Sequence, residues 1–120
     1  MVTRTKLRQS AAPHLLAGER IQAAFVATTG LAQGGSGYRA VVVTDRRILL
    51  FSLSFTGKAK DLLGEFDRDT QLGPAHGAMH YATDALGVPL LIHRRFFGDV
   101  ADADAARSSG PFTGLGPPRG

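Results

Sequence analysis

Six basic side chains lie in or beside segments that have the composition of turns, and they are the best candidates for a binding function. Guanidinium and ammonium groups donate charge-assisted hydrogen bonds to phosphate and carboxylate oxygens. If the turns that carry them lie on one rim of the fold, they form a site for an anionic ligand. The alternative is that these residues are simply solvated, as charged residues in turns usually are. The candidates are Arg46, Arg47, Lys58, Lys60, Arg94 and Arg95.

The histidines lack the spacing of a metal site. His76 and His80 are four residues apart, which would place both on one face of a helix, but the segment Gly73–Gly77 contains two glycines and a proline that disfavour a helix. His93 is the third histidine in this half of the chain, and no metalloprotease motif surrounds it. We therefore expect no metal and no cofactor.

The hydroxyl and carboxyl groups do not form a catalytic set. Ser36, Ser52 and Ser54 lack the G-x-S-x-G turn of a serine nucleophile and have no assignable histidine partner. Glu65 and Asp67 alternate as exposed acids on a strand commonly do. The glycine-rich segment before residue 38 has neither the ending of a P-loop nor G-x-G-x-x-G spacing, so it is interpreted as a hairpin loop. The sequence predicts a protein that is not an enzyme.

The composition fits one globular domain. The chain has 120 residues, 43% of them hydrophobic, and a net charge of +4. It has no cysteine, which excludes disulfides, thiolate catalysis and cysteine-ligated metals. Its longest apolar runs are far shorter than the roughly 20 residues that a membrane-spanning helix needs. From these features we expect a cytoplasmic protein.

The ends of the chain differ from its centre. Residues 1–9 are predicted to be a flexible basic arm, because they carry charge without apolar periodicity. Residues 10–107 are predicted to form a single domain, which starts with a short helix from Ser10 to Gly18. Residues 108–120 are rich in Gly and Pro and are predicted to be disordered.

Short strands fill the predicted domain. Apolar residues alternate with period two from Ile21 to Gly30, and β-branched residues are dense from Tyr38 to Thr44. The Asp45 turn then leads into an antiparallel strand, Ile48–Ser54, which gives the clearest hairpin. Further strands are predicted at Lys60–Phe66, where a short helix is the alternative, and at Ala78–Thr83 and Val88–Arg95, before a helix at Asp99–Arg107.

This pattern resembles the bacterial PH-like domains, relatives of the pleckstrin-homology and GRAM modules. The resemblance covers roughly residues 15–107. It rests on the central hairpin YRAVVVTDRRILLF, on Gly18 and Glu19 before the first strand, and on a late apolar strand followed by a Phe and an Ala-rich helix. It implies a mainly β fold, a small antiparallel barrel of six or seven strands with a C-terminal helix and a short N-terminal helix.

The resemblance implies binding rather than catalysis, since members of this family bind phosphoinositide head groups, peptides or other proteins. In lipid-binding members the basic residues lie in the loop between the first two strands. Here the corresponding segment, residues 31–37, has no cation, which disfavours specific phosphoinositide recognition.

Two functional hypotheses follow. The first is a non-enzymatic PH-like interaction module that binds a protein or peptide partner, including a second copy of the chain. The alternative is peripheral binding to an anionic membrane lipid surface through the basic turns. Nucleic acid is disfavoured as a partner, because the chain does not interleave basic residues with exposed aromatic ones.

Overall fold

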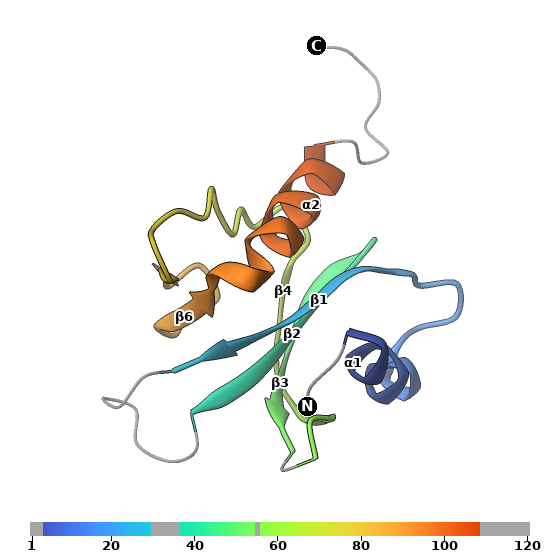
Figure 1. The fold of residues 1–120 in the computed structure, drawn as a ribbon. Coiled ribbons are helices and arrows are strands. Elements are labelled where there is room, and N and C mark those ends of the chain that lie inside the picture. Colours follow the sequence, from blue (N-terminus) through green and yellow to red (C-terminus); the bar gives the residue numbers. More distant parts are fainter. Residues whose placement is uncertain (1–3, 30–36, 55, 109–120) are drawn as a thin grey trace.

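The computed structural model describes residues 4–29, 37–54 and 56–108 (Figure 1). Within these residues, six strands form one antiparallel sheet in the order β4-β3-β2-β1-β6-β5, which confirms the prediction of a mainly β fold. The strands are β1 (Ile21–Thr28), β2 (Tyr38–Thr44), β3 (Arg47–Leu53), β4 (Ala59–Asp67), β5 (His80–Thr83) and β6 (Leu90–His93).

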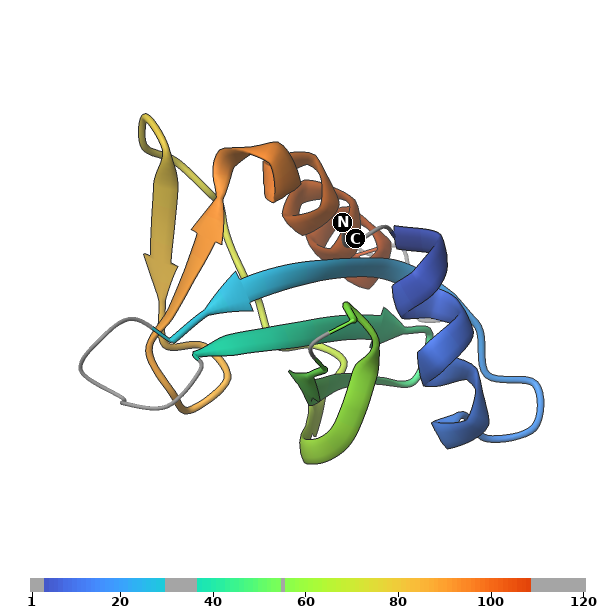
Figure 2. The same cartoon turned by 60° about the horizontal axis from the view of Figure 1, so that its bottom comes forward.

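Helices cover both faces of the sheet (Figures 1 and 2). The first is α1 (Arg4–Ala11), which continues into the short 3-10 helix η1 (Ala12–His14). The second is α2 (Phe97–Ser108), which follows the 3-10 turn η3 (Arg94–Phe96). In the part of the chain that is described, neither helix has the length and hydrophobicity required to cross a bilayer.

The alternation of side chains along β2 explains why both faces are apolar. Val41 and Val43 pack in the core beneath α2, together with Val100 of that helix. Val42 points the other way, into a second core that includes Leu7 of α1. A strand buried on both sides requires a continuous run of apolar residues, which is what the β2 sequence provides.

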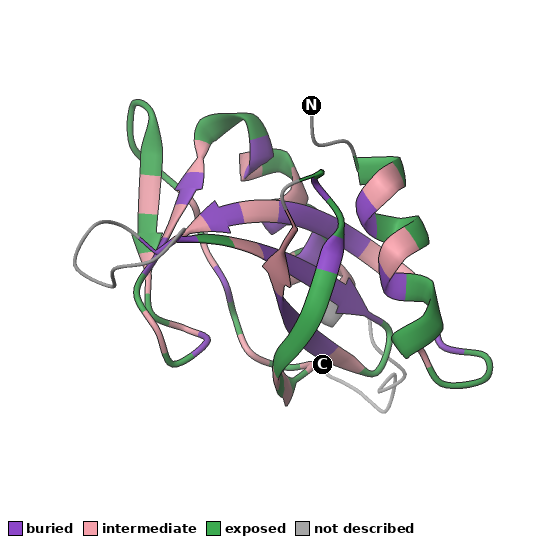
Figure 3. Cartoon of the chain, turned by 90° about the horizontal axis from the view of Figure 1, so that it is seen from below, coloured by how far each residue is buried: buried purple, intermediate pink, exposed green. Residues whose placement is uncertain are grey.

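The predicted central hairpin is confirmed. β2 pairs with β3 in a regular antiparallel register that runs from Arg39 opposite Ser52 to Val43 opposite Ile48. The next segment forms a strand rather than the alternative helix. This strand, β4, has two register irregularities against β3 and lies at the edge of the sheet, where most of its residues are exposed (Figure 3).

The late elements were predicted in the correct order. β5 and β6 are shorter than the segments predicted for them, and α2 begins two residues before the predicted helix. Phe96, Val100 and Ala103 are part of the core beneath this helix, and Phe97 packs against it. The loop predicted at 31–37 and the tail predicted at 108–120 lie almost entirely outside the described residues.

The N-terminal segment differs from the prediction. Arg4–Ala11 form α1 instead of a flexible arm, and Leu7 and Ala11 of this helix are fully buried. These two residues are four apart, so they lie on one side of a helix and pack on the sheet. Ser10, the first residue of the predicted helix, lies inside α1, where its hydroxyl donates to the carbonyl of Lys6 and accepts from the amide of Ala59.

Hydrogen bonds hold the segment between β4 and β5 against α2. The carboxylate of Asp104 accepts hydrogen bonds from the backbone amides of Leu72 and Gly73, at 3.0 and 2.9 Å. The hydroxyl of Tyr81 in β5 donates to the carbonyl of Leu72. Leu72 itself is buried in the core beneath α2. These contacts hold the connection, which has no regular secondary structure, against the helix.

Candidate functional site

The sheet separates the two pairs of basic residues that flank β3. Arg46 and Arg47 lie at the turn between β2 and β3, where β3 begins. Lys58 and Lys60 are exposed beyond the other end of that strand, at the start of β4. β3 has seven residues, and at about 3.3 Å per residue it holds the two pairs roughly 20 Å apart.

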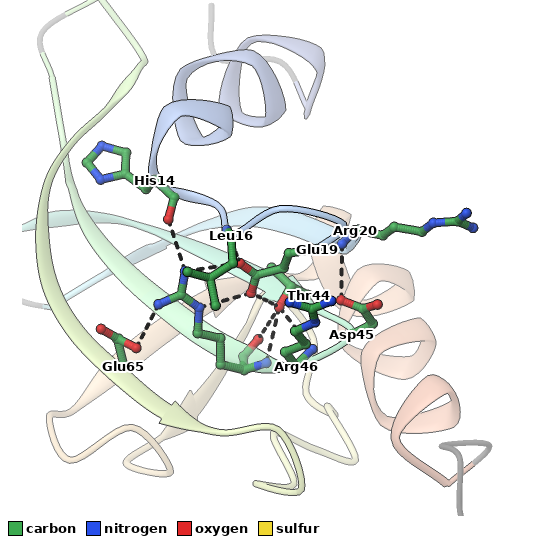
Figure 4. A network of polar contacts seen from close by, with 9 residues as sticks. His14, Leu16, Glu19, Arg20, Thr44, Asp45, Arg46 and Glu65 are labelled. Carbon is green, nitrogen blue, oxygen red and sulfur yellow. Dashed lines mark hydrogen bonds and ion pairs between the residues drawn. The ribbon is translucent and has the colours of Figure 1, made fainter.

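Arg47 is the centre of an ion-pair network at one end of the sheet. Figure 4 shows this network and labels its partners His14, Glu19 and Glu65. The guanidinium of Arg47 donates to both carboxylate oxygens of Glu19, at 2.9 and 3.0 Å, and to Glu65 Oε1 at 2.7 Å. It also donates to the carbonyl of His14 at 3.0 Å. These contacts join η1, β3, β4 and the segment that precedes β1. Arg47, one of the predicted anion-binding residues, is therefore paired with acids of its own chain.

Glu19 is the buried partner in this network. Its side chain is fully buried and also accepts hydrogen bonds from the hydroxyl of Thr44 at 2.6 Å and from the amide of Leu16 at 2.8 Å. Chiefly because Arg47 donates to it, the pKa of Glu19 is lowered from 4.5 to about 2, even though burial opposes the charge. The same contacts raise the pKa of Arg47 above its ordinary value. The network thus holds the segment before β1 against the central hairpin.

A groove of about 830 Å³ lies at the opposite end of β3. Its floor consists of the end of β1 and the start of β2. One wall is formed by the residues that lead out of β3, and the other by β5, β6 and η3. Figure 2 shows how these elements are arranged around one another. The lining residues are Val26, Thr28, Tyr38, Leu53, Ser54, Gly57, His80, Leu91, His93, Arg95 and Phe96.

Of the six predicted anion-binding residues, Arg95 is the one that lines this groove. Its guanidinium lies 5.0 Å from the centre of the Phe96 ring, a cation–π contact. Arg4 of α1 lies 5.4 Å from the same ring, but it is ion-paired with Asp99 at 2.7 Å. Arg95 makes no ion pair with a described residue. Arg94, its exposed neighbour, is not part of the lining.

Two histidines lie side by side in the groove wall. His80 of β5 is directly opposite His93 of β6, and their ring centres are 5.3 Å apart with an edge-to-face geometry. The Nδ1 atom of His93 accepts a hydrogen bond from the amide of Arg95, which places the proton of the neutral ring on Nε2. Within the described residues, no three histidine, cysteine or acidic side chains group as metal ligands would.

α1 connects the two walls of the groove. Lys6 donates to the carbonyl of Thr56, in the turn between β3 and β4. Arg4 donates to both oxygens of Asp99, at the start of α2, and to the carbonyl of Arg95. One short helix thus holds both sides of the opening. The spacing of Leu7 and Ala11 was the available sequence signal for this helix, and a pattern of only two apolar residues was too weak to reveal it.

A smaller hollow of about 410 Å³ lies behind the end of β1. Thr29, which is 6% exposed, contributes to its lining. Its amide donates to the carbonyl of Gly37, while its hydroxyl has no hydrogen-bond partner among the described residues. Buried hydroxyl groups usually find a partner, so this position is an energetic weak point.

Comparison of the chain with protein-family models, with curated proteins and with solved structures finds no match.

Proposed function

We propose that the chain is a PH-like interaction module that binds a peptide segment of a protein partner, without chemical turnover, in the groove between β3 and β6. The groove is the observation that carries this proposal. Its lining combines apolar side chains with a few polar and basic ones, and its volume is within the range of about 300–1,000 Å³ usual for ligand sites. Its hydroxyl, imidazole and guanidinium groups are suited to holding a ligand in place.

The architecture supports the PH-like part of the proposal. The resemblance implies a bent antiparallel sheet whose interior is covered by a C-terminal helix. In this chain β1 pairs with β2 on one side and meets β6 on the other, through Thr28 opposite Leu91. α2 packs on the core that these strands share. Such an arrangement leaves an opening beyond the helix, and the groove lies there.

The proposal is tested by selecting ligands for the groove and then locating them. Random peptides displayed on phage are selected against the immobilised protein, and the selected peptide is synthesised and titrated into ¹⁵N-labelled protein. We expect amide shifts concentrated at residues 53–57 and 91–96. A Thr28→Trp substitution, which fills the groove floor, should weaken binding by about tenfold or more. The matched control is Gln71→Trp, at an exposed position that does not line the groove.

Three results would overturn the proposal. The first is a selection that yields no specific peptide. The second is a peptide whose affinity is unchanged by Thr28→Trp. The third is binding to vesicles that contain phosphatidylserine, but not to phosphatidylcholine vesicles, with salt-sensitive shifts around Arg46 and no peptide binding. That pattern would assign the protein to an anionic lipid surface instead.

A further inference from the structure

We infer that the groove is specific for an acidic peptide segment, in which a carboxylate bound by Arg95 lies next to a large apolar side chain. This inference rests on the proposed function and adds the chemical class of the partner.

The charge of the groove supports an anionic partner. The described lining residues include no Asp or Glu, but they include one guanidinium and two imidazoles. A ligand carboxylate would therefore meet donors and no like charge. An arginine also binds a carboxylate through two parallel hydrogen bonds, a geometry that selects this group over a neutral amide.

The contrast between Arg4 and Arg95 identifies the residue that binds the carboxylate. Both guanidinium groups lie over the ring of Phe96, within 5.4 and 5.0 Å of its centre. Arg4 is neutralised by Asp99, whereas Arg95 has no carboxylate partner among the described residues. The cation–π contact holds the Arg95 guanidinium near the ring without consuming its hydrogen-bond donors. Arg95 is thus oriented and available.

The apolar part of the groove accounts for the second half of the ligand. Val26, Leu53 and Leu91 line it together with Phe96. Tyr38, at the start of β2, also lines it and is 53% exposed. An aromatic side chain with this exposure offers a large contact area at a low cost in conformational entropy. A leucine or phenylalanine of the ligand would cover these surfaces and remove them from water.

The donor set favours a carboxylate over a polyphosphate head group. Recognition of a phosphoinositide relies on several charge-assisted donors that converge on its phosphates. In this groove Arg95 is the only guanidinium among the described lining residues, and no lysine lines it. Lys58 follows the lining residue Gly57 and is exposed, but it does not itself line the groove. One guanidinium matches the single charge of one carboxylate.

The experiment compares four blocked hexapeptides that differ at single positions. The parent is acetyl-Gly-Glu-Phe-Leu-Gly-Gly-amide, and its variants carry Gln for Glu, Lys for Glu, or Ala for Phe. Dissociation constants are measured from amide shifts of the labelled full chain. We expect the parent to bind about tenfold more tightly than the Gln peptide and also more tightly than the other two. Arg95→Gln should abolish the preference for Glu over Gln, and Arg94→Gln, the matched control, should retain it.

Each outcome separates this inference from the proposed function. Equal binding of the Glu and Gln peptides in the groove, or a preference that survives Arg95→Gln, overturns the acidic specificity and leaves peptide binding intact. Failure of all four hexapeptides, when phage-selected peptides do bind, overturns the inference in the same way. Binding of inositol trisphosphate that depends on Arg95, and that displaces no peptide, would replace the carboxylate with a phosphate.

Discussion

Glu19 shows how one buried carboxylate joins segments that are distant in the sequence. It lies before β1, yet it binds Thr44 at the end of β2 and Arg47 at the start of β3. A buried ion pair contributes little when compared with apolar residues of the same shape, but removal of one partner leaves the other charge uncompensated. The network should therefore be sensitive to single substitutions.

Replacement of Glu19 by Gln should lower the free energy of unfolding at pH 7 by about 2–3 kcal/mol. The substitution keeps the size of the side chain and removes its charge, so that Arg47 retains only Glu65 as an acidic partner. Urea denaturation measures the loss. Glu65→Gln is the matched control, since the Glu65 side chain is 54% exposed and its pair should contribute less than about 1 kcal/mol. Equal losses in the two variants would contradict this account.

The pH dependence of stability should identify the same residue. The pKa of Glu19 is about 2 in the folded protein and 4.5 without the network. The unfolded chain therefore binds this proton first as the pH falls. The stabilisation is complete above about pH 4.5 and is lost progressively toward pH 2. In Glu19→Gln, stability should fall less steeply than in the original protein across this window. If the free energy of unfolding falls equally steeply with pH in both proteins, other carboxylates cause the acid sensitivity.

A substitution at Thr29 should raise the free energy of unfolding rather than lower it. Its buried hydroxyl has no partner among the described residues, so replacement by Val removes an unsatisfied group and preserves the shape of the side chain. We expect Thr29→Val to raise the free energy of unfolding by about 1 kcal/mol, as measured by urea denaturation. Thr28→Val, at the half-exposed neighbouring position, should give a smaller gain. A loss of stability in Thr29→Val would mean that a bound water satisfies the hydroxyl.

At the scale of elements, α1 is the helix that the amino-acid sequence did not predict. Its sequence is dominated by charged and polar residues, and only Leu7 and Ala11 are buried. Tertiary contacts hold it on the sheet, among them the ion pair of Arg4 with Asp99. This ion pair joins residues 95 positions apart, so a local pattern could not reveal it.

Weakening that ion pair should loosen α1 without unfolding the sheet. Asp99→Asn removes the acid of a pair in which Arg4 is about half exposed, so the expected cost is below about 1 kcal/mol. Hydrogen exchange of the amides of Arg8–Ala11 should become a few times faster, and the amides of β2 should be unaffected. Asp102→Asn, an exposed position on the same helix, is the control. Equal exchange rates of these amides in the two variants would show that the Arg4–Asp99 ion pair does not hold α1 on the sheet.

The strands were predictable because their signals are local. Three consecutive valines marked β2, an apolar run of Ile, Leu and Phe marked β3, and the Thr44–Arg47 turn indicated their pairing. The sequence also indicated Arg95 as a candidate. It could not show that Arg95 would lie in a groove and Arg47 in an internal network, since that depends on which acids fold against each arginine.

At the scale of the whole molecule, the pairing between β1 and β6 is the sparsest in the sheet. β1 and β2 pair over most of their length, whereas β1 and β6 meet at the single register pair Thr28 and Leu91. Beyond this point the two strands diverge, and the groove lies at the same place. The hairpin of β5 and β6 therefore depends on its contacts with the core beneath α2 for its position.

This asymmetry predicts two levels of local stability. Amides of Tyr81 and Ile92, in the β5–β6 hairpin, should exchange with solvent through openings of lower free energy than amides of Val42 and Leu49, in the central hairpin. Hydrogen exchange followed by NMR at several denaturant concentrations measures both. If all four amides exchange through openings of the same free energy, the sheet unfolds as one cooperative unit. The sparse pairing between β1 and β6 then does not lower the local stability of the β5–β6 hairpin.

The pair of Thr28 and Leu91 also sets an order of events during folding. It joins residues separated by about half of the chain, so its closure costs more entropy than any neighbouring hairpin and occurs late. During synthesis, a nascent chain that has emerged only through β4 can already form its four meandering strands. It still lacks the wall that carries His93 and Arg95. The groove is therefore complete only after β6 and η3 have folded against β1, and a ligand of the groove would distinguish chains that have folded these elements from chains that have not.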